Sequence, residues 1–204
     1  MRLIGMLDSP FVRRVAVSMR LMGLPFTHES VSVFRQFDDF ARVNPVVKAP
    51  TLVTDAGVML MDSTLILEHV ERLAAPERRL TPEAQADHAR SQHLIGLALA
   101  ACEKTVQIVY EFNVRPEDKR HGPWLERVTG QLLAAYGLLE AELGDRDAWL
   151  FGDRPMQADI TIAVAWRFTQ FVAADRVLAA DHPKLAAFSA RAEALEAFVA
   201  APLE

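Results

Sequence analysis

Three short polar motifs in the first third of the chain have residue types that could hold an anionic ligand. The first is Ser9-Pro10, which follows an apolar run and precedes a helical pattern. Serine can cap a helix whose first residue is proline, and capping alone would account for the motif. Alternatively, a hydroxyl beside unpaired N–H groups at the positive end of a helix favours a bound anion such as a thiolate. Position in the sequence leaves both interpretations open.

The second motif is Asp62-Ser63, which precedes the helical pattern of residues 64–70. Helix capping again explains it without any ligand. A ligand carboxylate at this helix start would find N–H groups and the Ser63 hydroxyl, while Asp62 could pair with an ammonium group. Together the two residues would suit the α-amino acid end of a ligand.

The third motif is Lys48-Ala49-Pro50, directly before a predicted strand. Proline is tolerated at the first residue of a strand because no ladder hydrogen bond is lost there. If the Ala49–Pro50 bond is cis, the turn would leave the N–H and C=O of Ala49 open for an extended peptide ligand. The sequence does not determine the isomer.

The elements that must position these motifs follow from hydrophobic periodicity. Residues 2–6, 11–22 and 26–33 predict a β-α-β unit with parallel neighbouring strands, and Gly23-Leu24-Pro25 predicts the end of its helix. A short helix is expected around residues 38–42, then a hairpin of residues 51–54 and 58–61, then a helix over residues 63–73. This order predicts a mixed four-stranded sheet covered by helices.

Two domains are expected, because the character of the sequence changes near residue 76. Residues 1–75 would form the mixed domain, residues 76–82 a polar linker with a proline at each end, and residues 83–204 an all-helical domain. The helical domain shows long helical patterns at residues 83–112, 122–143 and 158–172, with two shorter stretches after Pro183.

Composition excludes several classes of protein. The chain has 204 residues, of which 51% are hydrophobic and 24% charged, and its longest apolar run, residues 94–102, is far shorter than the roughly 20 residues of a membrane span. Without a recognisable leader, the protein is expected to be soluble and cytoplasmic. One cysteine, Cys102, and histidines without metal-ligand spacing predict no disulfide and no metal site. A net charge of −5 argues against nucleic-acid binding.

Taken together, the motifs resemble those of the cytosolic glutathione S-transferase family, in particular bacterial members with Ser-Pro-Phe at the start of the first helix. The residues concerned are Ser9-Pro10-Phe11-Val12-Arg13-Arg14-Val15, Asn44-Pro45, Lys48-Ala49-Pro50-Thr51-Leu52, Asp62-Ser63, Gly152-Asp153-Arg154 and Ala158-Asp159-Ile160. The resemblance implies an α/β thioredoxin-like N-terminal domain, an all-α C-terminal helical domain and a homodimer. It also implies glutathione as co-substrate and an activity that requires no metal.

The resemblance assigns site residues one by one. Ser9 would stabilise the glutathione thiolate, and the backbone of Ala49, before a cis Pro50, would pair with the cysteinyl unit. Asp62 and Ser63 would hold the γ-glutamyl end, and Lys48 would neutralise the glycyl carboxylate. Candidates for the electrophile site are Phe11, Arg13 and Tyr110.

Departures from the family pattern restrict which active-site types and which helix cap this chain can have. The first loop has no tyrosine, and Ser9 stands where the branch that performs disulfide exchange has cysteine. Met156 replaces the usual serine or threonine cap of a later helix, which would leave Asp159 without its usual partner.

The resemblance therefore implies a glutathione transferase that promotes attack of the thiolate on a small hydrophobic electrophile. Two alternatives stay open at this point. One is glutathione-dependent reduction of peroxides or disulfides, and the other is a glutathione-transferase-like binding module without turnover.

Overall fold

A computed structural model describes residues 1–144 and 148–203 of the chain. The chain divides into two compact units, one formed by Met1–Thr81 together with Ala194–Glu204, and the other by Pro82–Glu193. The sequence had assigned everything after residue 82 to the helical domain. The structure differs because the last residues of the chain pack within the first unit.

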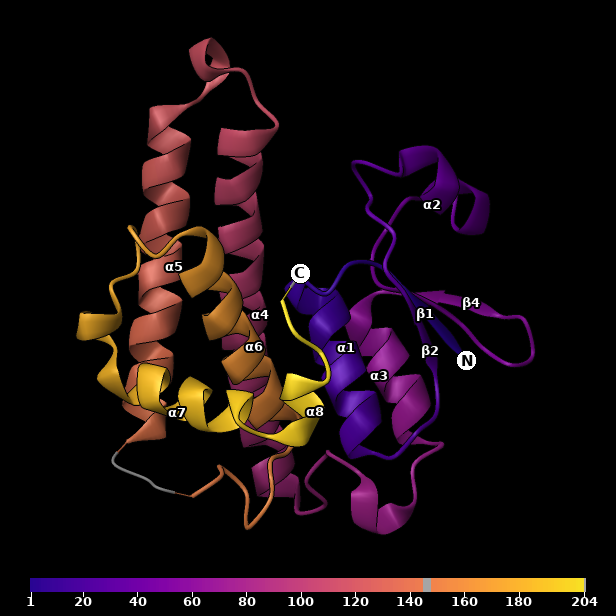
Figure 1. Ribbon diagram of the computed structural model, residues 1–204. Coiled ribbons are helices and arrows are strands. Elements are labelled where there is room, and N and C mark those ends of the chain that lie inside the picture. The colour runs from indigo at the N-terminus through magenta and orange to yellow at the C-terminus, as the bar shows by residue number, and fades with distance from the viewer. Residues whose placement is uncertain (145–147, 204) are drawn as a thin grey trace. The chain divides into compact units, whose positions relative to one another are not determined.

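The first unit is a mixed α/β structure, as predicted (Figure 1). Its elements are β1 (Arg2–Ile4), α1 (Pro10–Leu21), β2 (Thr27–Glu29), α2 (Phe37–Val43), β3 (Thr51–Val53), β4 (Met59–Met61), α3 (Ser63–Glu71), η1 (Pro76–Arg78) and α8 (Glu196–Val199). The strands form one sheet in the order β2-β1-β3-β4, in which β1 and β2 are parallel and the other pairs antiparallel. Helices α1 and α3 pack against each other beside this sheet.

Helix α1 begins and ends at the local signals that the sequence contains. Pro10 is its first residue, and Gly23 follows its end with a φ of 70°. The Leu24 N–H donates to the Met19 carbonyl at 2.9 Å, which closes the last turn in a Schellman arrangement. The predicted helix is confirmed to within one residue at each end.

The strands are shorter than predicted, each spanning three residues. Gly5 directly follows strand β1 and has a φ of 135°. A Cβ atom at this position would lie 2.7 Å from Cγ2 of Val12 and 3.1 Å from Cβ of Ala49. Only glycine therefore lets the first loop pass so close to both α1 and the segment before β3.

The strand registers bring the three polar motifs to one end of the sheet. Ile4, the last residue of β1, pairs with Thr51, the first residue of β3. Thr51 in turn pairs with Met61, the last residue of β4. The loop after β1, the residues before β3 and the residues after β4 consequently share this end.

The C-terminal segment joins the first unit through Arg13. This side chain is 1% exposed, and its Nε donates to the Ala201 carbonyl at 2.7 Å. Its guanidinium also lies 5.6 Å from the centre of the Phe198 ring in α8. The buried charge of Arg13 is thus used to hold the end of the chain against α1.

The second unit is all-helical, as predicted. It contains α4 (Gln85–Asn113), η2 (Glu117–Lys119), α5 (Gly122–Leu143), α6 (Gln157–Val172), η3 (Ala179–Asp181) and α7 (Pro183–Glu193). Helix α4 packs against α5 and α6, and α6 packs against α7. Inside this unit the Tyr136 hydroxyl lies 2.9 Å from the Ala165 carbonyl and 2.6 Å from the Thr169 hydroxyl, which in turn lies 2.8 Å from the Thr105 hydroxyl.

The start of α6 is stabilised by Asp159, although Met156 stands in place of the serine or threonine that is its usual partner. One carboxylate oxygen accepts the Leu150 N–H and the other the Met156 N–H, each at 2.9 Å. Asp159 is fully buried, and this burial raises its pKa to about 6. The carboxylate of Asp159 thus accepts from two backbone amides, a pair of contacts that the sequence pattern did not reveal.

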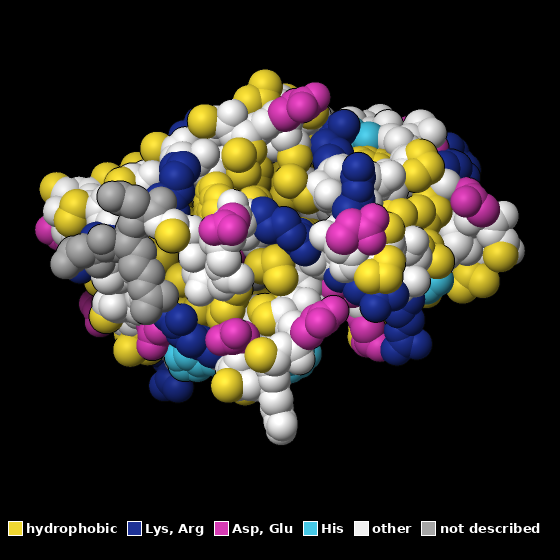
Figure 2. Space-filling view, turned by 90° about the horizontal axis from the view of Figure 1, so that it is seen from below, with side chains coloured by type: hydrophobic (Ala, Val, Ile, Leu, Met, Phe, Trp, Pro, Cys, Tyr) yellow, Lys and Arg dark blue, Asp and Glu magenta, His cyan; other side chains and the backbone are white. Residues whose placement is uncertain are grey.

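Charged side chains of both signs are interspersed with apolar ones on the face shown in Figure 2. Within the described part of the chain, no helix is both long and apolar enough to cross a membrane.

Candidate active site

The first loop, between β1 and α1, is held to the sheet by its own backbone. The Gly5 N–H donates to the Glu29 carbonyl at 3.0 Å, and Nε2 of His28 lies 2.8 Å from the Gly5 carbonyl. These contacts fix the path of the chain toward Ser9.

Ser9 occupies the residue before α1 but does not cap it through its side chain. Its backbone is extended, its carbonyl accepts the Arg13 N–H at 2.9 Å, and its hydroxyl makes no capping hydrogen bond. The side chain is half-buried. Because the first N–H groups of a helix have no partner within it, this helix start keeps donors that could stabilise a negative charge.

The Ala49–Pro50 bond is cis, which answers the question that the sequence left open. Among the described residues, no backbone hydrogen bond involves the N–H or the carbonyl of Ala49. This residue therefore offers one donor and one acceptor to an extended peptide, which is the pairing expected in strand addition.

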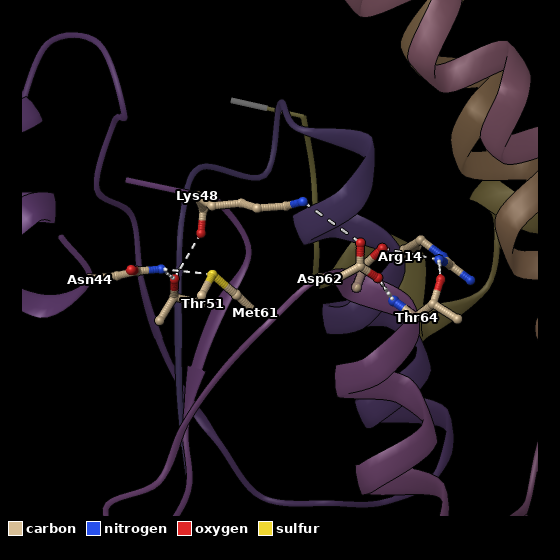
Figure 3. Close-up of polar contacts among 8 residues, drawn as sticks. Arg14, Asn44, Lys48, Thr51, Met61, Asp62 and Thr64 are labelled. Atoms are coloured by element: carbon tan, nitrogen blue, oxygen red, sulfur yellow. Dashed lines mark hydrogen bonds and ion pairs between the residues drawn. The ribbon is translucent and has the colours of Figure 1, made fainter. Parts of the chain in front are cut away.

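Two buried residues that the sequence analysis did not select brace this segment. Asn44 donates through Nδ2 to the Thr51 hydroxyl at 2.9 Å, and this hydroxyl donates to the Lys48 carbonyl at 2.8 Å (Figure 3). Asn44 also accepts the Val46 N–H at 3.0 Å. The sequence signal was Asn44-Pro45, which was used only as part of the family pattern.

Asp62 stands before α3 with a φ of 70°, and its Oδ1 accepts the Thr64 N–H at 2.9 Å. Its Oδ2 lies 3.8 Å from Nζ of Lys48, as Figure 3 shows. The side chains of Lys48 and Asp62 are 52% and 48% exposed, respectively, so this ion pair contributes little to the stability of the fold. Both charges are thus available to a ligand.

Ser63, the first residue of α3, is 4% exposed and is held by an arginine from α1. Nη1 of Arg14 lies 3.0 Å from the Ser63 hydroxyl oxygen and 3.3 Å from that of Thr64. Arg14 itself is 2% exposed. The sequence analysis quoted Arg14 only within the Ser-Pro-Phe motif, and its periodicity gave no sign that the side chain would turn toward α3.

The structure thus gathers six of the nine selected residues at one end of the sheet. They are Ser9, Lys48, Ala49, Pro50, Asp62 and Ser63. Together they provide a helix start with a hydroxyl, an open backbone amide pair, and a carboxylate beside a second helix start. This combination suits a small peptide that carries an anionic group, an ammonium and a carboxylate.

The three candidates for the electrophile site differ in burial and in their contacts. The guanidinium of Arg13 is buried and binds the carbonyl of Ala201, so we expect this side chain to serve the fold. Phe11 is half-buried in the first turn of α1. Tyr110 belongs to the second unit, is 45% exposed, and has a pKa raised by partial burial. The roles of Phe11 and Tyr110 stay predictions.

Family models match both units. Residues 3–78 match the model described as glutathione S-transferase, N-terminal domain, and residues 122–191 match the model of the C-terminal domain. Together the two matched segments cover more than half of the chain.

Two curated relatives extend along most of the chain. An uncharacterised glutathione-transferase-like protein, YibF of Escherichia coli K12, is 28% identical over 171 residues, which are 84% of this chain and 83% of the relative. Maleylacetoacetate isomerase of Pseudomonas aeruginosa is 28% identical over 159 residues, which are 72% of this chain and 71% of that protein.

Solved structures show the same architecture. A glutathione S-transferase from Methylobacterium radiotolerans, in complex with glutathione sulfonate, superposes with a TM-score of 0.90 at 29% identity, covering 98% of this chain and 93% of that one. A glutathione transferase family member from Pseudomonas fluorescens Pf-5, with bound glutathione, has a TM-score of 0.84 at 25% identity, covering 100% and 98%.

Proposed function

Because this chain belongs to the glutathione S-transferase family, we propose that it binds glutathione at the sheet end described above and transfers it to a small hydrophobic electrophile. The observation that supports this most is the open backbone of Ala49, which lies between the helix starts of α1 and α3 at that sheet end. Two related structures, solved with glutathione and with glutathione sulfonate, add to the support.

Each part of glutathione has a partner of matching chemistry in this proposal. The ammonium of the γ-glutamyl unit pairs with Asp62, and its carboxylate accepts from Ser63 and the start of α3. The cysteinyl backbone pairs with Ala49, and Lys48 neutralises the glycyl carboxylate. The sulfur then lies at Ser9, at the start of α1.

Ser9 lowers the pKa of the bound thiol in this proposal. A free thiol has a pKa near 8.5, so only a few per cent of it is thiolate at neutral pH. A hydroxyl that donates to sulfur, together with the positive end of α1, raises the thiolate population about tenfold or more. The thiolate attacks the electrophilic carbon, and the leaving group departs with the bonding electrons.

Calorimetric titration with glutathione, followed by activity assays, tests the proposal. We expect binding together with conjugation of an aryl halide. Turnover of an organic peroxide or a mixed disulfide in its place would favour the reductive alternative. Isomerisation of maleylacetoacetate should be assayed separately, because one relative is named for that reaction. Binding without any turnover would indicate a binding module, and absence of binding would refute the proposal.

We further propose that the protein acts as a cytoplasmic homodimer, as the family resemblance implies. Analytical ultracentrifugation of the purified protein should give twice the chain mass of 22.7 kDa. A monomer over the micromolar range would contradict the proposed dimer but leave the glutathione site unaffected.

A further inference from the structure

We propose that Arg14 is a positioning residue that makes the site selective for the α-carboxylate of the γ-glutamyl unit. It acts through the Ser63 hydroxyl and through its own buried charge. The inference rests on the proposed binding of glutathione.

The geometry joins α1 to the start of α3 at this point. Nη1 of Arg14 donates to the hydroxyl of Ser63 at 3.0 Å. The same nitrogen donates to the hydroxyl of Thr64 at 3.3 Å (Figure 3). One guanidinium nitrogen has two hydrogens, so it serves both oxygens at once. Because Arg14 is 2% exposed, its side chain has little freedom to leave this arrangement.

The contact determines what the Ser63 hydroxyl does. A serine hydroxyl has one hydrogen and two acceptor positions. Arg14 cannot accept a hydrogen bond, so the contact occupies an acceptor position of Ser63 and leaves the hydrogen to donate elsewhere. A carboxylate at the start of α3 is the acceptor that benefits, because a donor polarised by a cation forms a stronger bond to it.

Charge adds to this orientation. Asp62, which is needed for the ligand ammonium, would repel a ligand carboxylate at the same helix start. The positive guanidinium of Arg14 lies close to Ser63, where it offsets that repulsion. A negative charge at Asp62 and a positive charge at Arg14 therefore match the two charges of an α-amino acid.

The neighbouring Arg13 provides the matched control. Both arginines lie on α1 and are almost fully buried, but Arg13 donates to the backbone carbonyl of Ala201. Its substitution tests the loss of a buried arginine from the same helix without touching Ser63.

The experiment compares two ligands by calorimetry. Glutathione is the first, and γ-aminobutyryl-cysteinyl-glycine, which keeps the amino group but lacks the α-carboxylate, is the second. The wild type should prefer glutathione. In Arg14→Met, affinity for glutathione should fall about 10- to 100-fold while affinity for the analogue stays nearly unchanged, because a charge-assisted contact is lost. Arg13→Met should lower thermal stability and keep the wild-type preference.

Two further variants address the case in which Arg14→Met does not fold. Arg14→Lys keeps the charge but loses the fixed fork, so it should retain only part of the preference. Ser63→Ala should remove much of the preference, and adding it to Arg14→Lys should cost less than it does in the wild type. Independent, additive losses, or an unchanged preference in a folded Arg14 variant, would overturn the inference and leave the proposed function standing. Failure of the wild type to bind glutathione would refute the proposed function itself.

Discussion

The starts of α1 and α6 use polar side chains in opposite ways. At α6, both carboxylate oxygens of the fully buried Asp159 accept backbone N–H groups. At α1, the half-buried Ser9 makes no side-chain capping bond, although serine is a preferred cap. Similar polar signals in the sequence thus lead to a satisfied structural contact in one unit and to an unused hydroxyl in the other.

The difference shows how a helix start that serves the fold can be told from one that is available to a ligand. Residue type does not distinguish them, since both starts have a polar residue within the first turn. The distinguishing property is whether the hydrogen-bonding capacity is already used. Loss of Asp159 should accordingly affect stability, and loss of Ser9 should affect catalysis.

The largest effect is expected for Asp159→Ala. It leaves the N–H groups of Leu150 and Met156 without their acceptor in a buried place, so the free energy of unfolding should fall by about 2 to 5 kcal/mol. Urea denaturation followed by circular dichroism measures this. Asp153→Ala, at an exposed position before the same helix, is the control and should change little. Equal effects of the two substitutions would mean that the contacts of Asp159 do not distinguish the start of α6 from that of α1.

The next effect concerns the pH dependence of stability. Burial raises the pKa of Asp159 from 3.8 to about 6, so between these values the folded protein binds more protons at this residue than the unfolded chain. The contribution of Asp159 to stability is therefore most favourable below about pH 4, falls as pH rises to about 6, and is constant above that. The total change is about 3 kcal/mol.

Asp159→Asn isolates this contribution, because the amide does not titrate. The difference in unfolding free energy between wild type and Asp159→Asn should shift against the wild type as pH rises from 4 to 7. A difference that stays constant over this range would mean that the carboxylate titrates normally.

Ser9→Ala should impair catalysis without unfolding the protein. If the lost bond to the thiolate is worth about 1.5 to 3 kcal/mol, the pKa of bound glutathione rises by about 1 to 2 units and turnover at neutral pH falls about 10- to 100-fold. The defect should shrink as pH rises. Thiolate absorbance of the glutathione complex, titrated for both proteins, gives the pKa directly. Identical titration curves would remove Ser9 from the mechanism and leave the N–H groups of the first loop as the alternative.

The smallest effect is an expected gain in stability. Met156 precedes α6, is only half-buried and offers the first turn a thioether, which is a weak acceptor. Met156→Ser should therefore add a hydroxyl acceptor for the first turn and raise the free energy of unfolding by about 0.5 to 2 kcal/mol. The denaturation midpoint should increase. A lower midpoint would show that the packing of the methionine outweighs the cap.

Local signals account for what the sequence predicted correctly. Proline at the start of α1 and glycine after its end act on neighbouring residues, so this helix could be located to within one residue. Strand ends were less accurate, because pairing stops where the partner strand stops, and an apolar run does not contain that information. Strand β2, at the edge of the sheet beside β1, was predicted as residues 26–33 but spans Thr27–Glu29.

The site shows the same limit for side chains. Ser9, Ala49 and Ser63 stand next to the ends of predicted strands in the sequence, and the strand registers bring these ends together. The contacts of Arg13 and Arg14 could not be predicted, because their partners Ala201 and Ser63 lie far along the chain. Adjacent arginines with different partners look identical in a periodic pattern.

The attachment of the C-terminal segment to α1 constrains when the first unit can fold during synthesis. The first unit contains both Met1–Thr81 and Ala194–Glu204, so it can close only after residues 194–204 have been synthesised. Until then Arg13 lacks the Ala201 carbonyl that it binds in the folded state, and the loss of a hydrogen-bond acceptor by a buried cation is unfavourable. The second unit, Pro82–Glu193, is continuous and can be complete earlier. The part of the protein that emerges first is therefore the last to acquire its final packing.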